Sequence, residues 1–377
     1  MGSATAACER APRSTRGVTG RLRLLLLAVW FSVLSSGHHI AAEEEPGLYH
    51  RGAWRRAGSV GHPGPGRGAE LGDEREGETR ALVAEGSSDA FPRVDNSTVL
   101  FLHVFKCAGT SLREVFMAWA KLRGWSSAIV EHCKNPHYLQ NTDKICLNEQ
   151  NDLIDFGEQK WAVAGTRVMA GHFFWDFRHY VTPPYLMITT LRNPLELFVS
   201  SQQFSNRANT STLPEAVEFI GNIMKRRIGM PQPQDLAFIR RLMDQRIDYE
   251  YDGDPLPDEQ LRAMTATAVE ALKSFFVVGV VEQYEGFIEV LKKTLDPDAV
   301  YPSLWKAATE VRKNGSPVHS SEVLRAIDPV LVREFNATTL PFQWQVYNLA
   351  LELWHARCRE VLPPEDHRRL CSVPGHR

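Results

Sequence analysis

The stretch from Ser97 to Ser111 constrains this chain more than any other. An apolar run at 99–105, rich in β-forming residues, predicts a buried strand. Apolar residues at spacings of three and four then predict a helix. A strand, a short turn and a helix start direct backbone N–H groups at an anion, and a lysine lies beside them. The turn is therefore a candidate phosphate loop, made of Lys106, Cys107, Ala108, Gly109, Thr110 and Ser111.

The order of residues in this loop differs from that of a Walker loop. A Walker loop places its glycines before the lysine, whereas here Lys106 comes first and Gly109 follows three residues later. Because short glycine turns are common, an ordinary strand-to-helix turn with an exposed lysine is the alternative interpretation.

A second segment supports the phosphate interpretation. Residues 185–191 predict another buried strand, and Asn193-Pro194 ends it and begins a helix. Arg192 therefore lies at the carboxyl end of a strand, and Ser200 lies about two turns into the helix. In an open parallel sheet, ligands bind at these strand ends. An arginine and a serine can both bond to phosphate, so two sites on one sheet predict a ligand with phosphates at both ends.

Both segments are similar to motifs of the sulfotransferases. Residues 106–111 resemble the loop that binds the 5′-phosphosulfate group, and Arg192-Asn-Pro followed by Ser200 resembles the motif for the 3′-phosphate. Residues 275–284 are similar to a further "VG-x-x-E-x-Y" segment, although 277–281 also fits plain core packing. The resemblance covers roughly residues 97–362 and points to Golgi carbohydrate sulfotransferases, including the uronyl/heparan 2-O-sulfotransferase-like group.

The resemblance implies transfer of a sulfuryl group from 3′-phosphoadenosine-5′-phosphosulfate (PAPS) to a hydroxyl of a polysaccharide or of a glycoprotein glycan. The implied fold is α/β, a three-layer sandwich with a central parallel sheet, of the P-loop NTPase-like type. Lys106 would act in catalysis as well as in binding, because charge builds on the 5′-phosphate oxygen. Family members need no metal, and we expect neither a metal site nor a nucleic-acid partner.

The candidate base for the acceptor hydroxyl is His172, which follows a short apolar run. In the 2-O-sulfotransferase group this stretch resembles His-Gly-His, but Ala170 occupies the first position here, so only His172 carries over. A structural histidine at a strand end is the alternative interpretation. Asp176 and Glu114 are the fallback carboxylates.

Two other functions fit parts of the sequence. A nucleotide-dependent kinase would use the same phosphate cradle but would need a carboxylate that holds Mg²⁺ after a strand, for which no compelling aspartate stands out. A catalytically inactive glycan-binding protein on the same fold would explain the loss of a histidine at Ala170. The presence of Lys106, Arg192 and Ser200 argues against it.

The N-terminal part predicts targeting. Arginines precede the apolar segment 24–42, which indicates a cytoplasmic tail (1–23) and a signal anchor. Because that segment is short for a span, a cleaved signal peptide and secretion are the alternative. Residues 43–92 have the composition of a disordered stem. We therefore expect a single-pass type II Golgi membrane protein whose lumenal sulfotransferase domain covers residues 93–377.

Cysteines and sequons provide independent expectations for a lumenal domain. Cys133 with Cys146, and Cys358 with Cys371, could close small loops in an oxidising compartment, while Cys107 would remain a free thiol. In a cytosolic protein all would be reduced. N-glycosylation sequons begin at Asn96, Asn209, Asn314 and Asn336.

The remaining pattern gives the expected order of elements. Strands are predicted at 97–105, 167–173, 185–191 and 275–281, and helices at 110–123, from 194, and at 213–228, 234–247, 258–273, 282–295 and 341–361, with an irregular region at 130–160. The net charge of −2 gives no general basic field. The basic pairs and triplets at 225–227 and 240–241 fit solvated helix faces, and the aromatic cluster at 173–177 fits the core, with Trp175 the best candidate for stacking on a ligand.

Overall fold

We describe the protein from a computed structural model. It describes residues 94–133, 144–148, 152–154, 162–206, 209–231, 236–243, 257–310 and 318–372, all of which lie in one structural unit, Arg75–Arg377. The expected tail, anchor and stem, and the sequon at Asn314, lie outside these residues. Among the helices of the described ranges, none has the length and apolar composition needed to cross a membrane.

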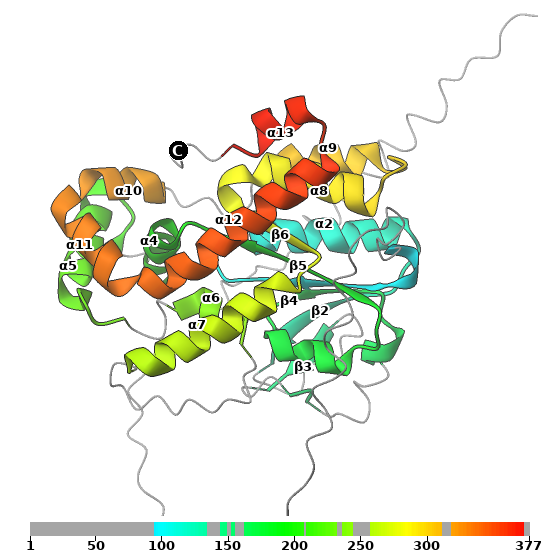
Figure 1. Ribbon diagram of the computed structural model, residues 1–377, viewed down its shortest axis with the longest axis horizontal. Coiled ribbons are helices and arrows are strands. Elements are labelled where there is room, and N and C mark those ends of the chain that lie inside the picture. Colours follow the sequence, from blue (N-terminus) through cyan, green and yellow to red (C-terminus); the bar gives the residue numbers. More distant parts are fainter. Residues whose placement is uncertain are drawn as a thin grey trace, which may run out of the picture. The chain divides into compact units, whose positions relative to one another are not determined.

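A parallel sheet forms the centre of the described structure (Figure 1). Its six strands pair in the order β3-β2-β4-β1-β5-β6, and every pairing is parallel. Their bounds are β1 Thr98–Leu102, β2 Ser127–His132, β3 Lys144–Leu147, β4 Val168–Gly171, β5 Tyr185–Leu191 and β6 Val277–Val280. Because all strands run the same way, their carboxyl ends meet at one edge of the sheet. This confirms the expected α/β fold with a parallel sheet.

Helices cover both faces of the sheet (Figure 1). On one face lie α2 (Gly109–Leu122), α8 (Tyr284–Leu295) and α9 (Pro302–Glu310), and on the other lie α6 (Ala237–Arg241) and α7 (Asp258–Lys273). The long helix α12 (Pro341–Val361) packs along the edge strand β6, and α13 (Pro364–Leu370) follows it. A separate group consists of α4 (Pro194–Ser205), α5 (Leu213–Arg227), α10 (Ser320–Ala326) and α11 (Pro329–Thr339).

The central strands are apolar because both of their faces are covered. Val99 to Leu102 of β1 are buried, as is the whole of β4. Parallel strands covered on both faces read as continuous apolar runs, which is why these segments stand out in the sequence. The apolar residues at 277–281 also lie mainly in this core, as their alternative interpretation predicts.

Several expected boundaries were wrong. The region 130–160 was expected to be irregular, but β2 and β3 lie at its start and form one edge of the sheet. These strands are short and β2 is only half-buried, so their apolar pattern is weak. The strand expected at 97–105 ends at Leu102, because the chain turns there into the phosphate loop. Helices α9, α10, α11 and α13 were not predicted.

Both expected disulfides are present. Cys133 pairs with Cys146 and joins the ends of β2 and β3, and Cys358 pairs with Cys371 and joins α12 to the end of α13. Cys107 is a free, buried thiol. These three findings confirm the assignment of cysteines made from the sequence.

Candidate active site

The candidate phosphate loop lies between β1 and α2. Lys106 and Ala108 have left-handed backbone conformations, with φ values of 62° and 59°. The loop is held from below by Thr190, whose hydroxyl donates to the carbonyl of Cys107 at 2.6 Å. Ala108 is the N-cap residue of α2, and an alanine side chain cannot cap the N–H groups of the first turn. The side chain of the N-cap residue therefore does not compete for these groups with an external acceptor, such as the oxygen atoms of an anion.

Gly109 is required by the close approach of a neighbouring side chain. A Cβ atom at this position would lie 1.5 Å from Cδ2 of His103 and 2.0 Å from its Nε2. No larger residue fits without moving the histidine, so the glycine in the loop serves packing as well as phosphate access.

One face of α4 connects the phosphate loop to Arg192. Glu196, Ser200 and Phe204 follow one another at spacings of four, so they lie along the same side of the helix. Arg192 bonds to Glu196 at one end, with its guanidinium nitrogens 3.0 and 3.3 Å from Oε2. At the other end, Nζ of Lys106 lies over the ring of Phe204 at 4.5 Å. Glu196 and Phe204 are about 12 Å apart along the helix axis.

The two helix starts at the site are not equivalent. Asn193 caps its own helix, because its Oδ1 accepts from the N–H groups of Leu195 and Glu196. Pro194 at the first helical position has no N–H group at all. The start of α4 therefore offers an anion fewer free backbone N–H groups than the start of α2, and side chains such as Arg192 and Ser200 would have to bind it. Ser200 is 7% exposed.

Glu282, which follows β6, holds the Arg192 segment in place. One of its oxygens accepts from the N–H of Asn193 at 2.6 Å, and the other accepts from the hydroxyl of Tyr347 in α12 at 2.9 Å. Burial raises the pKa of Glu282, while these two donors lower it. The carboxylate therefore connects β5, β6 and α12 at the carboxyl edge of the sheet.

His172 follows β4 at the same edge. Its backbone N–H donates to Val130 at 2.9 Å. Its Nδ1 lies 3.1 Å from the carbonyl oxygen of His103, and the two imidazole rings are stacked with centroids 3.9 Å apart. The preceding Gly171 packs directly on β2, because a Cβ there would lie 1.9 Å from the oxygen of Val130.

The electrostatic surroundings keep these histidines neutral. Burial lowers the pKa of His172 well below its ordinary value, and the positive charges of Arg241 and Arg113 act in the same direction. Burial, together with the charges of Arg113, Arg241 and Lys106, lowers the pKa of His103 to about 3. Burial and the charge of Arg241 lower the pKa of His132 to about 4. The neutral imidazole is the protonation state that a general base requires, and the lowered pKa at the same time makes it a weaker proton acceptor.

Arg241 contradicts one expectation from the sequence. The pair 240–241 was expected to form a solvated helix face, but the guanidinium of Arg241 lies 4.5 Å from the ring centroid of Phe174 and influences the histidine pKa values. Arg113 forms a salt bridge of 2.8 Å with Glu131, which also binds Lys144 at 3.2 Å. Arg241 in α6 and Arg113 in α2 therefore both place positive charge near His172 and His103.

The other predicted residues are placed as follows. Cys107 is fully buried and burial raises the pKa of its thiol, so this side chain does not face an anion as a thiolate. Of the fallback carboxylates, Glu114 is exposed on α2, and Asp176 is buried in the helical turn η3 (Trp175–Tyr180). Trp175 stacks on Phe275 with centroids 5.4 Å apart and lies under a guanidinium, so it is packed within the protein.

Sequence reasoning missed two residues of this site. His103 precedes the loop and lies within the apolar run 99–105, which predicts a strand. Glu282 belongs to the segment 275–284, whose resemblance to a family motif gives it no role of its own. A polar residue within two positions of the end of a buried strand was the available signal in both cases.

A comparison with protein families gives a match to the sulfotransferase family over residues 90–294, which is more than half of the chain. This chain belongs to the sulfotransferase family. The match covers the phosphate loop, Arg192, Ser200 and Glu282. No curated protein matches the chain.

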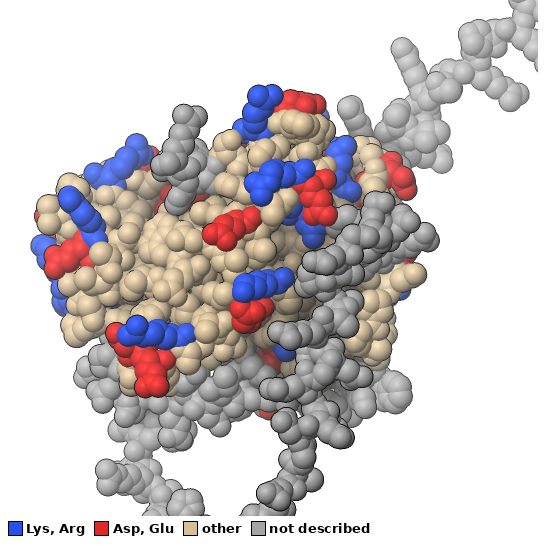
Figure 2. Space-filling view, in the orientation of Figure 1, with Lys and Arg blue, Asp and Glu red and all other residues tan. Residues whose placement is uncertain are grey.

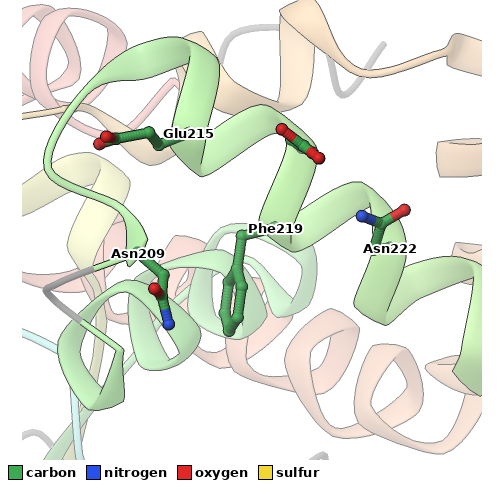
Figure 3. Close-up of a pocket in the computed structure, with 5 residues that line it drawn as sticks. Asn209, Glu215, Phe219 and Asn222 are labelled. Atoms are coloured by element: carbon green, nitrogen blue, oxygen red, sulfur yellow. The ribbon is translucent and has the colours of Figure 1, made fainter.

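Two surface features of this sulfotransferase do not involve the predicted active-site residues. Figure 2 shows basic and acidic side chains next to one another on the face displayed, so local charges decide what a given site attracts. A hollow of about 260 Å³ beside α5 is lined by Asn209, Glu215, Glu218, Phe219 and Asn222 (Figure 3).

Within the described ranges, no group of three or more histidine, cysteine or acidic side chains is arranged to hold a metal ion.

Proposed function

We propose that this sulfotransferase moves a sulfuryl group from PAPS to a hydroxyl of a carbohydrate, either a polysaccharide or a glycoprotein glycan. The observation that carries the proposal is the common face of α4. Arg192 lies at one end of this face and Lys106 at the other, with Ser200 between them. These two cationic side chains contact opposite ends of a stretch of helix about 12 Å long, from Glu196 to Phe204, which suits a ligand with phosphates at both ends.

The residues at the site fit this donor. The N–H groups at the start of α2 and the ammonium of Lys106 would hold the 5′-phosphosulfate. The guanidinium of Arg192 and the hydroxyl of Ser200 would hold the 3′-phosphate, since Asn193 already caps α4. PAPS, when bound, supplies the sulfuryl group and leaves as 3′-phosphoadenosine-5′-phosphate (PAP).

Three groups of the chain would then perform the chemistry. His172 accepts the proton of the attacking hydroxyl at Nε2, because its Nδ1 faces a carbonyl oxygen, which can only accept. Lys106 and the first-turn N–H groups of α2 stabilise the charge that develops on the departing 5′-phosphate oxygen. Arg192 holds the far end of the donor and so fixes its position along α4.

Placement of this domain in the lumen of the Golgi, behind an N-terminal anchor, is part of the same proposal. The two disulfides support it, because such bonds persist in oxidising compartments.

Calorimetric titration of the full-length protein with PAP tests the donor site. We expect binding that persists in a metal chelator and that weakens about 10- to 100-fold in Arg192→Ala, since a charge-assisted bond contributes about 1.5–3 kcal/mol. Lys106→Ala should also weaken it. The matched control is Arg262→Ala. Arg262 also forms an i,i+4 ion pair, with Asp258, but its side chain is 71% exposed, and this variant should bind PAP as the wild type does.

Transfer of radiolabelled sulfate from PAPS to a panel of glycosaminoglycans and glycoprotein glycans tests the reaction. Absence of PAP binding by folded protein would refute the donor site. PAP binding without transfer to any glycan would instead support an inactive glycan-binding protein.

A further inference from the structure

His103 is a buried residue that the proposed chemistry does not use directly. It follows β1 at the carboxyl edge of the sheet and is 5% exposed. Its backbone N–H donates to the carbonyl of Gly171 at 2.8 Å, which ties it to the strand that ends at His172. The two histidines therefore come from neighbouring strands, β1 and β4.

The ring of His103 lies between the phosphate loop and His172. On one side its Cδ2 and Nε2 approach Gly109 so closely that a Cβ there would overlap with them. On the other side it is stacked on His172, with an angle of 28° between the rings. A shift of the loop glycine would therefore move His103, and a shift of His103 would move His172.

The carbonyl of His103 determines which nitrogen of His172 is protonated. A carbonyl oxygen only accepts, so the 3.1 Å contact requires a proton on Nδ1 of His172. Nε2 then has a free lone pair, which is the form needed to take a proton from a hydroxyl group. The stacked ring restricts rotation of His172 and so keeps this contact in place.

We propose that His103 is a positioning residue for His172: its carbonyl fixes the tautomer, its ring fixes the orientation, and its contact with Gly109 couples both to the phosphate loop. The proposal rests on the proposed function in so far as His172 is the base. It extends that function by connecting the donor site to the acceptor base through one side chain.

The test compares His103→Ala, which removes the ring, with His103→Phe, which keeps a flat ring for stacking. The histidines of the full-length protein are labelled with ¹⁵N, and His172→Gln identifies the signals of His172. In the wild type we expect a protonated Nδ1 and an unprotonated Nε2. In His103→Ala the two nitrogen shifts should move toward each other, because the ring is free to exchange tautomers, and in His103→Phe they should return to the wild-type values.

Two further readouts separate positioning from a general structural effect. PAP affinity should fall less than the rate of sulfate transfer to the glycan panel, which should fall at least about ten-fold in His103→Ala and recover in His103→Phe. Each of three outcomes would overturn the proposal. The first is that the His172 shifts do not change in His103→Ala, the second is a proton on Nε2 of His172 in the wild type, and the third is an equal loss of sulfate transfer in both variants. Absence of PAP binding in the wild type would instead refute the proposed function, and the tautomer measurement would still decide the role of His103.

Discussion

Replacing Tyr347 with phenylalanine tests the connection between α12 and the proposed nucleotide site. The hydroxyl of Tyr347 donates to Oε2 of Glu282 at 2.9 Å, and the residue is 1% exposed. Phenylalanine fills the same space, so the change removes one hydrogen bond and leaves little cavity. A hydrogen bond to a charged acceptor contributes about 1.5–3 kcal/mol, and we therefore expect Tyr347→Phe to lower the free energy of unfolding by about 2 kcal/mol.

The matched control is Tyr284→Phe. Tyr284 is also buried, but its hydroxyl donates to a neutral acceptor, the carbonyl of Ala308, at 3.3 Å. Its loss should cost only about 0.5–1.5 kcal/mol. Urea denaturation of the full-length protein, followed by circular dichroism, gives both values from the shift of the midpoint at constant slope.

The pH dependence sharpens this test. Burial raises the pKa of Glu282, and the hydrogen bonds from Asn193 and Tyr347 stabilise its ionised form in the fold. At acid pH Glu282 is protonated, so the loss of one of these donors costs less free energy of unfolding. The deficit of Tyr347→Phe should therefore be greatest near neutral pH and should shrink toward that of the control as the pH falls. PAP affinity should also fall more than in the control, because Glu282 holds the N–H of Asn193. Equal unfolding midpoints for the two variants near neutral pH would refute the reasoning.

Three other predictions follow from single residues. Burial lowers the pKa of His132 to about 4, so below about pH 6.5 the unfolded chain binds a proton that the folded protein does not. The free energy of unfolding, measured with urea, should therefore fall from pH 6.5 toward pH 4, and His132→Gln should reduce this dependence on pH. Burial raises the pKa of the Cys107 thiol, so mass spectrometry should find it alkylated by iodoacetamide only after unfolding, and labelling of the native protein would contradict this. Asn209 is exposed beside a hollow, whereas the carboxamide of Asn336 accepts a hydrogen bond from Trp344; after secretory expression, Asn209→Gln should lose one enzymatically removable glycan and Asn336→Gln none.

The sequence predicted the local parts of the site because each is built from neighbouring residues. The phosphate loop, the helix start at Asn193-Pro194 and the position of Ser200 all depend on strand, turn and helix patterns within about fifteen residues. Parallel strands place their carboxyl ends at one edge, so the sequence also predicted that Lys106 and Arg192 belong to the same sheet edge. Each disulfide joins two cysteines that are only 13 residues apart, so these pairings are local as well.

The sequence could not predict contacts between distant segments. The carbonyl of His103 meets His172 across 69 residues, and Glu282 binds Asn193 and Tyr347 across 89 and 65 residues. Short strands such as β2 and β3 were also missed, because their position depends on pairing rather than on their own pattern.

What the sequence by itself determined, then, is which residues are candidates for binding phosphate and in what order they follow the strands of a parallel sheet. Only the tertiary structure decided that His103 lies against His172, that Glu282 holds the Arg192 segment, and that Arg241 turns toward the histidines. The physical reason is that hydrophobic periodicity and helix capping act along a few turns of chain. Strand order and the packing of side chains from different strands depend on the whole folded core.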